Sequence, residues 1–349
     1  ITGKNEVTIL NDDGDQIIIG KNIVIATGSE VAVPDNVVID EKDILSSTGA
    51  LSLSKVPDEL VVVGAGYIGL EMGSVWSRLG SKVTVIEYAD KIIPNMDHEI
   101  SNQFQKILIK QGIDFKLSTA FKKITKKNNK LYISIETKEG QTSEISCDKV
   151  LISIGRKPYT FGLNLDEAGV QTDSKGFIIT KDNFQTSAEN IFAIGDCKLG
   201  PMLAHKASEE GTALAEIIVG QVGHVNFDTI PSVVYTAPEV ASVGKTEEEL
   251  KSLGLKYKVG KFPFTANAKA KVMHETLGFV KILSDANSDK VLGVHMIGPD
   301  VGNMIAELAL AMEFGASSED IARTCHAHPT LTESIKEAAL NVEKRAIHI

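Results

Sequence analysis

Cysteine is scarce in this sequence, with three residues among 349. Cys147, Cys197 and Cys325 are 50 and 128 positions apart, so there is no close pair from which a zinc knuckle or a local dithiol relay could be built. A low cysteine count is typical of proteins from reducing compartments. Taken by themselves, the three thiols are expected to be small, partly buried side chains.

Long hydrophobic runs and an excess of positive charge are also missing. No apolar run approaches the roughly 20 residues that a membrane-spanning helix needs. The formal charge of −10 argues against general nucleic-acid binding and against a polybasic membrane anchor, because both require a basic face. With 43 % apolar and 23 % charged residues, the chain has a globular composition, and its length predicts two or three domains.

Apolar runs separated by glycine and proline predict mixed α/β structure along the whole chain. Strands are expected at residues 7–10, 17–25, 60–63, 82–87, 113–121, 130–137 and 149–158, and near 232–236, 240–243, 256–264, 278–284 and 291–298. Residues 188–197 are expected to form a strand followed by a turn. Helices are expected at residues 67–79, 98–111, 201–219, 301–314, 317–324 and 333–345. No internal repeat or low-complexity stretch interrupts this pattern.

A glycine-rich turn lies between the first long strand and the first long helix. Gly64-Ala65-Gly66-Tyr67-Ile68-Gly69 matches G-x-G-x-x-G in the strand–turn–helix context that a dinucleotide site requires. The first glycine would permit the tight turn, the second would let a diphosphate approach the backbone, and the third would let helix and strand pack closely. Bare N–H groups at the helix N-terminus would then face the phosphates.

An acidic residue closes the next strand, "KVTVIE", about twenty residues after the glycines. Glu87 stands where a carboxylate accepts hydrogen bonds from the ribose hydroxyls of NAD, whereas an NADP site would usually offer arginine. The pattern therefore predicts NAD(H) binding. The alternative is a tight strand–helix turn that holds no ligand.

The segment "CHAHPTLTE" (325–333) groups a thiol, two imidazoles and a carboxylate. A metal site formed by His326, His328 and Glu333 is one reading, although no further ligands lie nearby in the sequence. Cys325 as a nucleophile is a second. A capping box formed by Thr330 and Glu333 at the start of the last helix is a third. A proton-transfer pair formed by His328 and Glu333 is the fourth.

Several segments taken in order resemble one family. They are "ATGSE" (26–30), "SSTGALSL" (46–53), the glycine turn and its helix, "ISIGRKP" (152–158), "IFAIGD" (191–196), "GPMLAHKASEEG" (200–211), "PSVVYTAPEVASVGKTEEEL" (231–250) and "CHAHPTLTE". Together they resemble the dihydrolipoamide dehydrogenases of the pyridine-nucleotide disulfide oxidoreductase family, over essentially the whole chain. The last segment and "GPMLAHKA" are far more specific than the glycine turn.

The resemblance implies a role for individual residues. His328 would transfer protons and Glu333 would orient it, while His326 would be structural; no metal site is implied. The NAD contacts implied are Gly64, Ala65, Gly66, Tyr67, Ile68, Gly69, Leu70, Glu71, Glu87, Phe121 and Gly155. The FAD contacts implied are Thr27, Gly28, Ser29, Asp196, Met202, Leu203, Ala204 and His205.

The resemblance also implies an α/β fold of doubly wound, three-layer FAD- and NAD-binding domains with a C-terminal α+β dimerisation domain. We expect a remnant of the FAD domain at 1–29, an NAD domain at 30–155, a central domain at 156–226 and an interface domain at 227–349. The implied enzyme is an NAD-dependent flavoprotein. It would form a homodimer, serve the lipoyl domains and acyltransferase core of 2-oxo acid dehydrogenase complexes, and reside in bacterial cytoplasm or mitochondrial matrix.

Two family features are expected to lie outside these residues, namely the redox-active C-x-x-x-x-C disulfide and the FAD glycine turn. The sequence therefore leaves two classes of function open. One is the oxidoreductase, with glutathione and mercuric reductases as weaker relatives. The other is a non-catalytic, NAD-binding dimerisation module.

Overall fold

The computed structural model describes residues 1–128 and 130–349. The chain divides into two compact units, of which the first comprises residues 1–32 and 155–226 and the second comprises residues 33–154 and 227–349. The four-part division expected from the sequence is finer than this one and stays a prediction. Among the described residues, no helix combines the length and apolar character needed to cross a bilayer.

The first unit contains short strands and one long helix. Its elements are β1 (Glu6–Ile9), β2 (Gln16–Ile19), β3 (Ile23–Ile25), β4 (Ser29–Val31), β13 (Arg156–Pro158), β14 (Ile191–Ala193), η1 (Gly195–Cys197) and α4 (Ala204–Ile218). β1 and β2 form an antiparallel ribbon, β14 pairs with β3 in parallel, and β13 pairs with β4 antiparallel. Two small apolar clusters, around Ile178 and Phe184, fill this unit.

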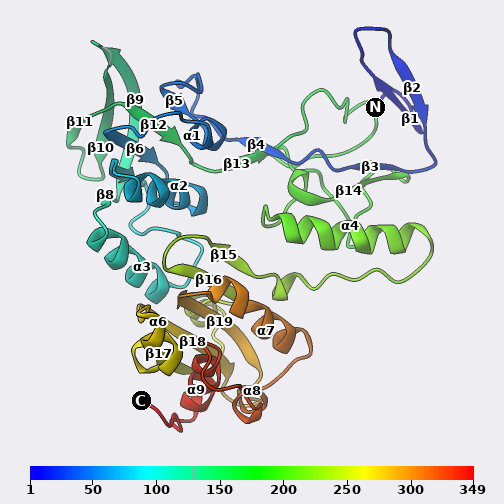
Figure 1. The fold of residues 1–349 in the computed structure, drawn as a ribbon. Coiled ribbons are helices and arrows are strands. Elements are labelled where there is room, and N and C mark those ends of the chain that lie inside the picture. Colours follow the sequence, from blue (N-terminus) through cyan, green and yellow to red (C-terminus); the bar gives the residue numbers. More distant parts are fainter. Residues whose placement is uncertain (129) are drawn as a thin grey trace. The chain divides into compact units, whose positions relative to one another are not determined.

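The second unit begins with a parallel sheet in the order β5-β12-β6-β7-β8. Its elements are β5 (Ile44–Leu45), α1 (Ser47–Leu51), β6 (Glu59–Val63), α2 (Tyr67–Arg78), β7 (Lys82–Ile86), α3 (His98–Lys110), β8 (Asp114–Lys116) and β12 (Lys149–Ile152). An antiparallel sheet of β9 (Thr119–Lys127), β10 (Lys130–Thr137) and β11 (Thr142–Cys147) adds a further layer (Figure 1).

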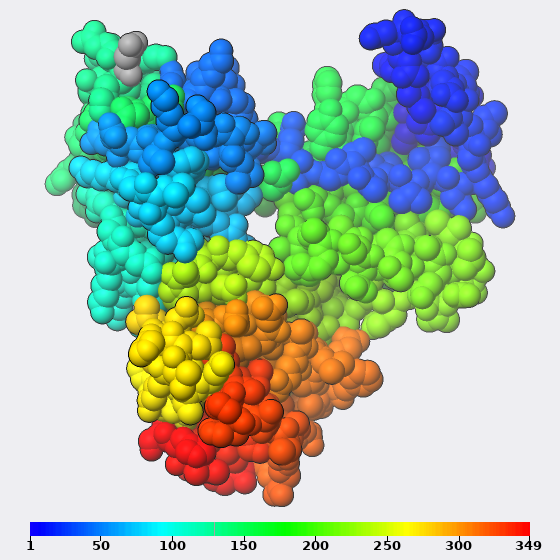
Figure 2. Space-filling view, in the orientation of Figure 1, coloured from blue at the N-terminus to red at the C-terminus, as the bar shows by residue number. Residues whose placement is uncertain are grey.

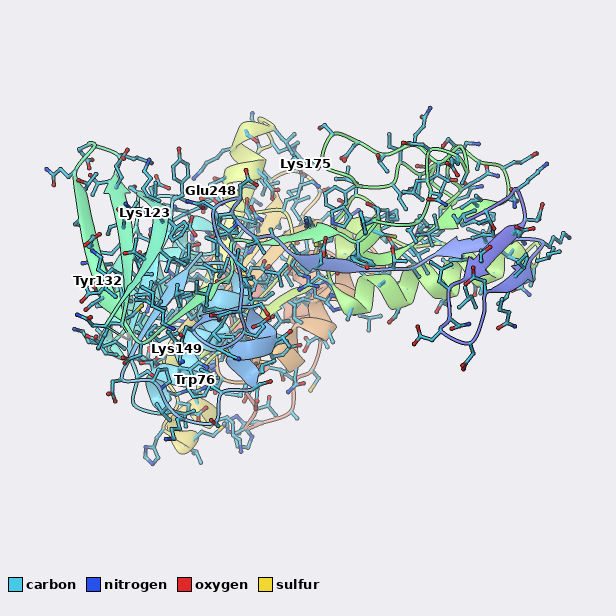
Figure 3. The ribbon with its side chains drawn as sticks, turned by 90° about the horizontal axis from the view of Figure 1, so that it is seen from above. Trp76, Lys123, Tyr132, Lys149, Lys175 and Glu248 are labelled. Carbon is cyan, nitrogen blue, oxygen red and sulfur yellow. The ribbon has the colours of Figure 1, made fainter. Side chains whose placement is uncertain are left out.

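Alternation of apolar residues along β6 and β7 explains why this part has three layers. Val62 and Val85 face the helices and join the core that contains Leu70 and Phe104. Val61 and its neighbours on the opposite side pack against apolar residues of the antiparallel sheet. The outer side of that sheet is polar, and Lys123 and Tyr132 lie on it (Figure 3). The predicted α/β, three-layer fold class is confirmed.

The remainder of the second unit is an α+β domain around an antiparallel sheet in the order β15-β16-β19-β18-β17. Its elements are η2 (Phe227–Thr229), β15 (Ser232–Val234), β16 (Glu239–Gly244), α5 (Glu247–Ser252), β17 (Tyr257–Pro263), η3 (Phe264–Ala266), α6 (Ala268–Met273), β18 (Phe279–Asp285), β19 (Val291–Gly298), α7 (Val301–Glu313), α8 (Ser318–Arg323) and α9 (Glu333–Val342). α3 adjoins this domain, since the Gln111 side chain donates to the Ala237 carbonyl at 2.7 Å. Figure 2 shows the cyan atoms of α3 beside the yellow-green atoms of the β15–β16 segment.

The strand expected at residues 149–158 was wrong as one element. β12 ends at Ile152, and β13 begins at Arg156 in a different sheet and in the other unit. Gly155 lies between them with φ 128, a left-handed conformation that breaks a strand and that glycine adopts without strain. The apolar residues of this segment end at Ile154, and the charged residues Arg156 and Lys157 follow Gly155, so the glycine and the change of composition together marked the break.

Candidate functional site

The glycine turn has the three-part geometry that its sequence predicted. Gly64 has φ 105, and a Cβ there would lie 2.4 Å from the Ser153 carbonyl oxygen. A Cβ on Gly69 would lie 2.2 Å from the Gly64 carbonyl oxygen, so this glycine permits α2 to approach β6. A Cβ on Gly66 would meet no atom within 4 Å, so this position faces open space. Gly66 is also the N-cap of α2 and supplies no side-chain cap, which leaves first-turn N–H groups for a ligand.

The Glu87 carboxylate lies directly beside this turn. Its Oε2 accepts the Ala65 N–H at 2.7 Å, and its Oε1 accepts the Ala89 N–H at 2.8 Å. A carboxylate oxygen has two lone pairs, so both oxygens keep capacity for a ligand hydroxyl. Glu87 therefore shapes the turn and also presents an acceptor next to it.

A cavity of about 330 Å³ opens at this edge of the parallel sheet. Its lining contains Pro34, Val63, Gly64, Ile86, Glu87, Tyr88, Thr119, Ala120, Phe121 and Ile154. The carboxyl ends of parallel strands are where open α/β sheets bind ligands. Of the NAD contacts expected from the sequence, Gly64, Glu87 and Phe121 meet at this cavity. Pro34, Thr119 and Ile154 were missed because they follow no short motif and reach the cavity only through the tertiary fold.

Three other expected NAD contacts are turned away from the cavity or lie outside this unit. Leu70 is fully buried in the helix-side core. Glu71 accepts the Tyr235 N–H at 2.8 Å, and its pKa is raised because burial outweighs that hydrogen bond. Gly155 belongs to the first unit. Tyr67 and Ile68 are half-buried in the first turn of α2.

A second polar cluster, in the first unit, joins two of the residues expected to contact FAD. The Ser29 hydroxyl donates to the Asp196 Oδ2 at 2.6 Å. Arg156 holds Ser29 from the other side, with its Nε donating to the hydroxyl at 2.7 Å and its Nη2 donating to the carbonyl at 2.6 Å. The Thr27 hydroxyl donates to the Tyr159 carbonyl at 2.5 Å, and Gly28 has φ 74. The "ATGS" loop is therefore fastened to the β13 segment and to the Asp196 turn.

Next to Asp196, at Gly195, is a buried charged cluster that the sequence analysis did not identify. Glu210 is fully buried and accepts the Gly195 N–H at 2.6 Å. The Lys198 ammonium donates to the same carboxylate at 2.9 Å, and the Lys206 ammonium lies 3.3 Å from it. Burial outweighs the charge of Glu210 and lowers the pKa of Lys206. The i, i+4 spacing of Lys206 and Glu210 on α4 was a possible signal, but such pairs are usually exposed.

The remaining FAD candidates lead into α4. Met202 and Leu203 are half-buried, and Leu203 is the N-cap of the helix without a side-chain cap. Ala204 and His205 are exposed in the first turn. This segment presents main-chain groups and one imidazole on the same unit as Asp196.

The His328–Glu333 pair is formed, and it is accessible. The Nδ1 of His328 lies 2.9 Å from one Glu333 oxygen and 3.2 Å from the other, and 70 % of the imidazole side chain is exposed. The Thr330 N–H donates to the Glu333 Oε2 at 2.9 Å. Burial acts to raise the pKa of Glu333, but the bonds from Thr330 and His328 outweigh it and lower that pKa. With Nδ1 engaged, Nε2 is the nitrogen left to exchange a proton.

The capping box considered for Thr330 and Glu333 is only half formed. The helix α9 begins at Glu333 with Thr332 as its N-cap, and Thr332 makes no side-chain cap hydrogen bond. The Thr330 hydroxyl donates instead to the Ala327 carbonyl at 2.7 Å. The Glu333 carboxylate is therefore shared between one backbone N–H and the imidazole of His328.

The neighbouring candidates in "CHAHPTLTE" have other surroundings. The His326 side chain is only 5 % exposed, and its Nε2 lies 2.8 Å from the Glu307 Oε1, which raises the pKa of His326. Cys325 is exposed, and all three cysteines are free. Burial raises the pKa of Cys147 to about 12 and also raises the pKa of Cys197, so neither is a reactive thiolate at neutral pH. Across the described part of the chain, no three His, Cys, Asp or Glu residues are grouped to hold a metal ion.

Comparison with family models matches two parts of the chain. Residues 1–211 match the model "Pyridine nucleotide-disulphide oxidoreductase". Residues 230–339 match the model "Pyridine nucleotide-disulphide oxidoreductase, dimerisation domain". Together they cover most of both compact units.

Curated relatives match over nearly the whole chain. The mitochondrial dihydrolipoyl dehydrogenase of Pisum sativum is 52 % identical over 347 residues, which is 99 % of this chain and 69 % of the relative. The mitochondrial enzyme of Bos taurus is 54 % identical over 97 % of this chain and 68 % of its own length. The leghemoglobin reductase of Glycine max is 52 % identical over 97 % of this chain and 65 % of its own length.

Solved structures share the fold. The HOCl-induced flavoprotein disulfide reductase of Escherichia coli, solved as its Cu(II) complex, superposes with a TM-score of 0.90 at 27 % identity, covering 97 % of this chain and 76 % of the other. A crystal structure of LpdA from Mycobacterium tuberculosis gives a TM-score of 0.89 at 25 % identity, covering 96 % and 72 %.

Proposed function

Because this chain belongs to the pyridine nucleotide-disulphide oxidoreductase family, we propose that it carries out the dihydrolipoyl dehydrogenase reaction. In this reaction two thiols of a dihydrolipoyl group become a disulfide, and NAD⁺ becomes NADH with release of one proton. FAD and NAD are the cofactors of this class. The relatives at 52–54 % identity favour this substrate over the glutathione or mercuric reductases considered from the sequence.

The NAD diphosphate would be held at the glycine turn. Gly66 leaves space where a side chain would stand, and the first-turn N–H groups of α2 carry no side-chain cap. Glu87 would accept the ribose hydroxyls, and the cavity beside Phe121 would take the adenosine end. A carboxylate at this position repels the extra phosphate of NADP, so the site favours NAD(H).

The residues of the first unit fit a flavin chain that carries hydroxyl groups. Asp196 offers a carboxylate acceptor held by Ser29, and the Thr27–Ser29 loop and the Met202–His205 segment would complete the contact. When bound, FAD supplies the two-electron transfer between the dithiol and NAD⁺. The chain's own contribution is to hold Asp196 rigidly through Arg156, Ser29 and Glu210.

His328 would accept the proton that a dihydrolipoyl thiol releases when it attacks a disulfide. Its Nε2 is the free acceptor, because Nδ1 donates to Glu333. The Glu333 carboxylate fixes this tautomer and stabilises the imidazolium that forms. Cys147, Cys197 and Cys325 do not form a disulfide with one another, so the disulfide that exchanges with the substrate is not made from these three thiols.

The dimerisation-domain match over residues 230–339 supports a homodimer. We further propose that the dimer serves the lipoyl domains and acyltransferase core of a 2-oxo acid dehydrogenase complex, as the dihydrolipoyl dehydrogenase relatives suggest. Several of those relatives are named as mitochondrial, which favours the matrix over bacterial cytoplasm.

The observation that carries this proposal is the His328–Glu333 contact on the same chain as an NAD-type glycine turn. The FAD-loaded holoenzyme should reduce NAD⁺ with dihydrolipoamide and should use NADP⁺ with reduced glutathione far more slowly. A holoenzyme that binds NADH but turns over neither substrate would support the non-catalytic dimerisation module instead. Faster turnover with another disulfide would support a different flavin reductase.

A further inference from the structure

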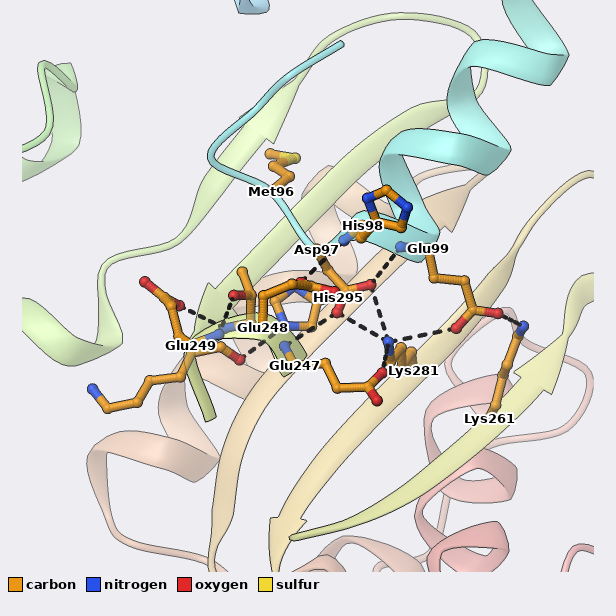
Figure 4. Close-up of polar contacts among 12 residues, drawn as sticks. Met96, Asp97, His98, Glu99, Glu247, Glu248, Glu249, Lys261, Lys281 and His295 are labelled. Carbon is orange, nitrogen blue, oxygen red and sulfur yellow. Dashed lines mark hydrogen bonds and ion pairs between the residues drawn. The ribbon is translucent and has the colours of Figure 1, made fainter. Parts of the chain in front are cut away.

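The second unit contains a buried cluster of opposite charges where α3 adjoins the antiparallel sheet (Figure 4). The Lys281 side chain, on β18, is only 1 % exposed and donates to both oxygens of Asp97, at 3.0 and 2.9 Å. The same ammonium donates to Glu247 at 2.7 Å and lies 3.4 Å from Glu99. Asp97 is fully buried as well, so this ion pair is shielded from solvent.

The cluster joins the N-termini of two helices. Asp97 is the N-cap of α3 and accepts the Glu99 N–H at 3.1 Å. Its other oxygen accepts the N–H of Glu247, the first residue of α5, at 3.3 Å. In the opposite direction, Glu248 of α5 accepts the His98 N–H of α3 at 3.2 Å. Lys281 thus neutralises the Asp97 carboxylate, which binds backbone N–H groups at the N-termini of both α3 and α5.

Buried charge pairs of this kind are a poor source of stability, because desolvation offsets their attraction. Burial acts to lower the pKa of Lys281, but the bond to Glu247 and the charge of Asp97 outweigh it and raise that pKa. The pair is therefore ionised at neutral pH. A charged pair that contributes little net stability still imposes one geometry on the backbone that carries it, since each partner is costly to leave unpaired.

The backbone carrying Asp97 is also the backbone that holds the dinucleotide turn. The segment 87–97 begins at Glu87, whose carboxylate accepts the Ala65 N–H at 2.7 Å. Further along, the Ile93 N–H donates to the Ala65 carbonyl at 2.9 Å, and the Ile93 carbonyl accepts the Ser101 hydroxyl at 3.3 Å. One segment therefore binds both backbone groups of Ala65 in the glycine turn, because Glu87 accepts its N–H and Ile93 donates to its carbonyl. Asp97 fixes the far end of that segment.

We propose that Lys281 is a positioning residue for NAD(H), which acts through Asp97 and the segment 87–97 to hold Ala65 and Glu87 in the ligand-ready arrangement. Lys281 itself lies on β18 of the antiparallel sheet β15-β16-β19-β18-β17 and does not line the cavity. This inference rests on the proposed assignment of the glycine turn as the NAD site. It also means that the sheet of the dimerisation domain is linked to the dinucleotide turn by hydrogen bonds, from Lys281 to Asp97 and from Ile93 to Ala65.

The test compares NADH affinity in the purified protein and its variants, by calorimetry well below the unfolding temperature. Lys281→Met leaves Asp97 buried without its counter-charge and can unfold the protein, so the double variant Asp97→Asn/Lys281→Met accompanies it. In the double variant the asparagine side chain still offers an oxygen to cap α3, while the buried charge pair is gone. The matched control is Lys258→Met, which removes a lysine of the neighbouring strand β17 that pairs with Glu343 at 2.5 Å and is 38 % exposed.

The expected result is a loss of NADH affinity on the order of ten-fold in the folded variants, which is typical of coupling through packed elements. Lys258→Met should bind NADH as the wild type does. Amide hydrogen exchange should quicken at Ile93 and Ala65 in the variants, while the amide of Val62 on the central strand keeps its protection. A role limited to overall stability would not produce this local difference.

Wild-type NADH affinity and unchanged Ile93 exchange in the folded double variant would overturn the inference while leaving the proposed function intact. If the wild type and the Lys258→Met control themselves bind no NADH, the assignment of the glycine turn fails, and the inference fails with it.

Discussion

Replacing Gly66 with alanine should separate ligand binding from folding at the glycine turn. Gly66 has φ −78 and ψ −175, which alanine adopts freely, and the new Cβ would meet no protein atom within 4 Å. The loss of unfolded-state freedom should stabilise the protein by about 0.4–1 kcal/mol. Alanine is a poorer N-cap than glycine by a similar amount, so the two effects offset each other to within about 1 kcal/mol.

The same methyl group stands where the proposed site receives the NAD diphosphate. Displacing the ligand from one or two charge-assisted N–H bonds removes roughly 1.5–3 kcal/mol of binding free energy. NADH affinity should therefore fall by about 10- to 100-fold. Calorimetric titration with NADH measures this loss, and urea denaturation of the same samples measures the free energy of unfolding.

Two other glycines of the same helix provide controls. A Cβ on Gly69 would lie 2.2 Å from the Gly64 carbonyl oxygen and 2.6 Å from the Ser153 Oγ, so Gly69→Ala should destabilise the fold by about 1–3 kcal/mol. A Cβ on Gly73 would make ordinary contacts of 3.5 and 3.6 Å with two valines. Gly73→Ala should therefore change neither the NADH affinity nor the free energy of unfolding greatly. Unaltered NADH binding by Gly66→Ala would refute the placement of the diphosphate.

Further predictions concern charged and titratable groups. Glu87→Arg should weaken NADH binding and improve NADPH binding, because the ribose hydroxyls lose their acceptor and a 2′-phosphate gains a partner. A variant that binds NADH as tightly as the wild type in calorimetry would count against this prediction. His295 is fully buried, which lowers its pKa below the usual 6.5, so the unfolded chain takes up the proton first as the pH falls. The free energy of unfolding should therefore be highest above the ordinary histidine pKa of 6.5 and should decrease as the pH falls below it. His295→Gln should flatten that decrease in urea titrations, and parallel curves for the two proteins would contradict the prediction. Glu210→Gln leaves the buried ammonium of Lys206 without its counter-charge and should lower the free energy of unfolding by about 3–5 kcal/mol, whereas Glu30→Gln, in the exposed pair with Lys157, should cost less than about 1 kcal/mol.

Much of the fold was predictable because the strong periodic segments are also the ones that form the core. The predicted helix at 98–111 is α3 (His98–Lys110), and its apolar residues Ile100, Phe104 and Leu108 recur at helical spacing and are buried. The short helices α1, α5 and α6 were missed, because five or six residues carry little periodicity. α8 (Ser318–Arg323) is equally short but was predicted at 317–324. For α5 the capping box of Thr246 and Glu249 was a usable signal.

The geometry of the candidate site residues was predictable where local sequence determines it, and their roles stay predictions. Gly64, Gly66 and Gly69 act within one turn, and His328 reaches Glu333 over five residues. Contacts between distant segments had no such signal. Examples are Arg156 on Ser29 and Lys281 on Asp97, which are 127 and 184 residues apart.

The central claim is that His328 takes the substrate proton and that Glu333 orients it. The direct measurement is lipoamide-dependent turnover of the FAD-loaded holoenzyme carrying His328→Gln, with His326→Gln as the matched control in the same segment. A positioned acid–base group contributes about 10²–10⁴-fold, so His328→Gln should lower turnover by that much, and Glu333→Gln by the same amount or less. Transfer of electrons from NADH to an artificial acceptor should survive all three changes, because it bypasses the thiol step. A tolerated His328→Gln together with a crippling His326→Gln would contradict the account.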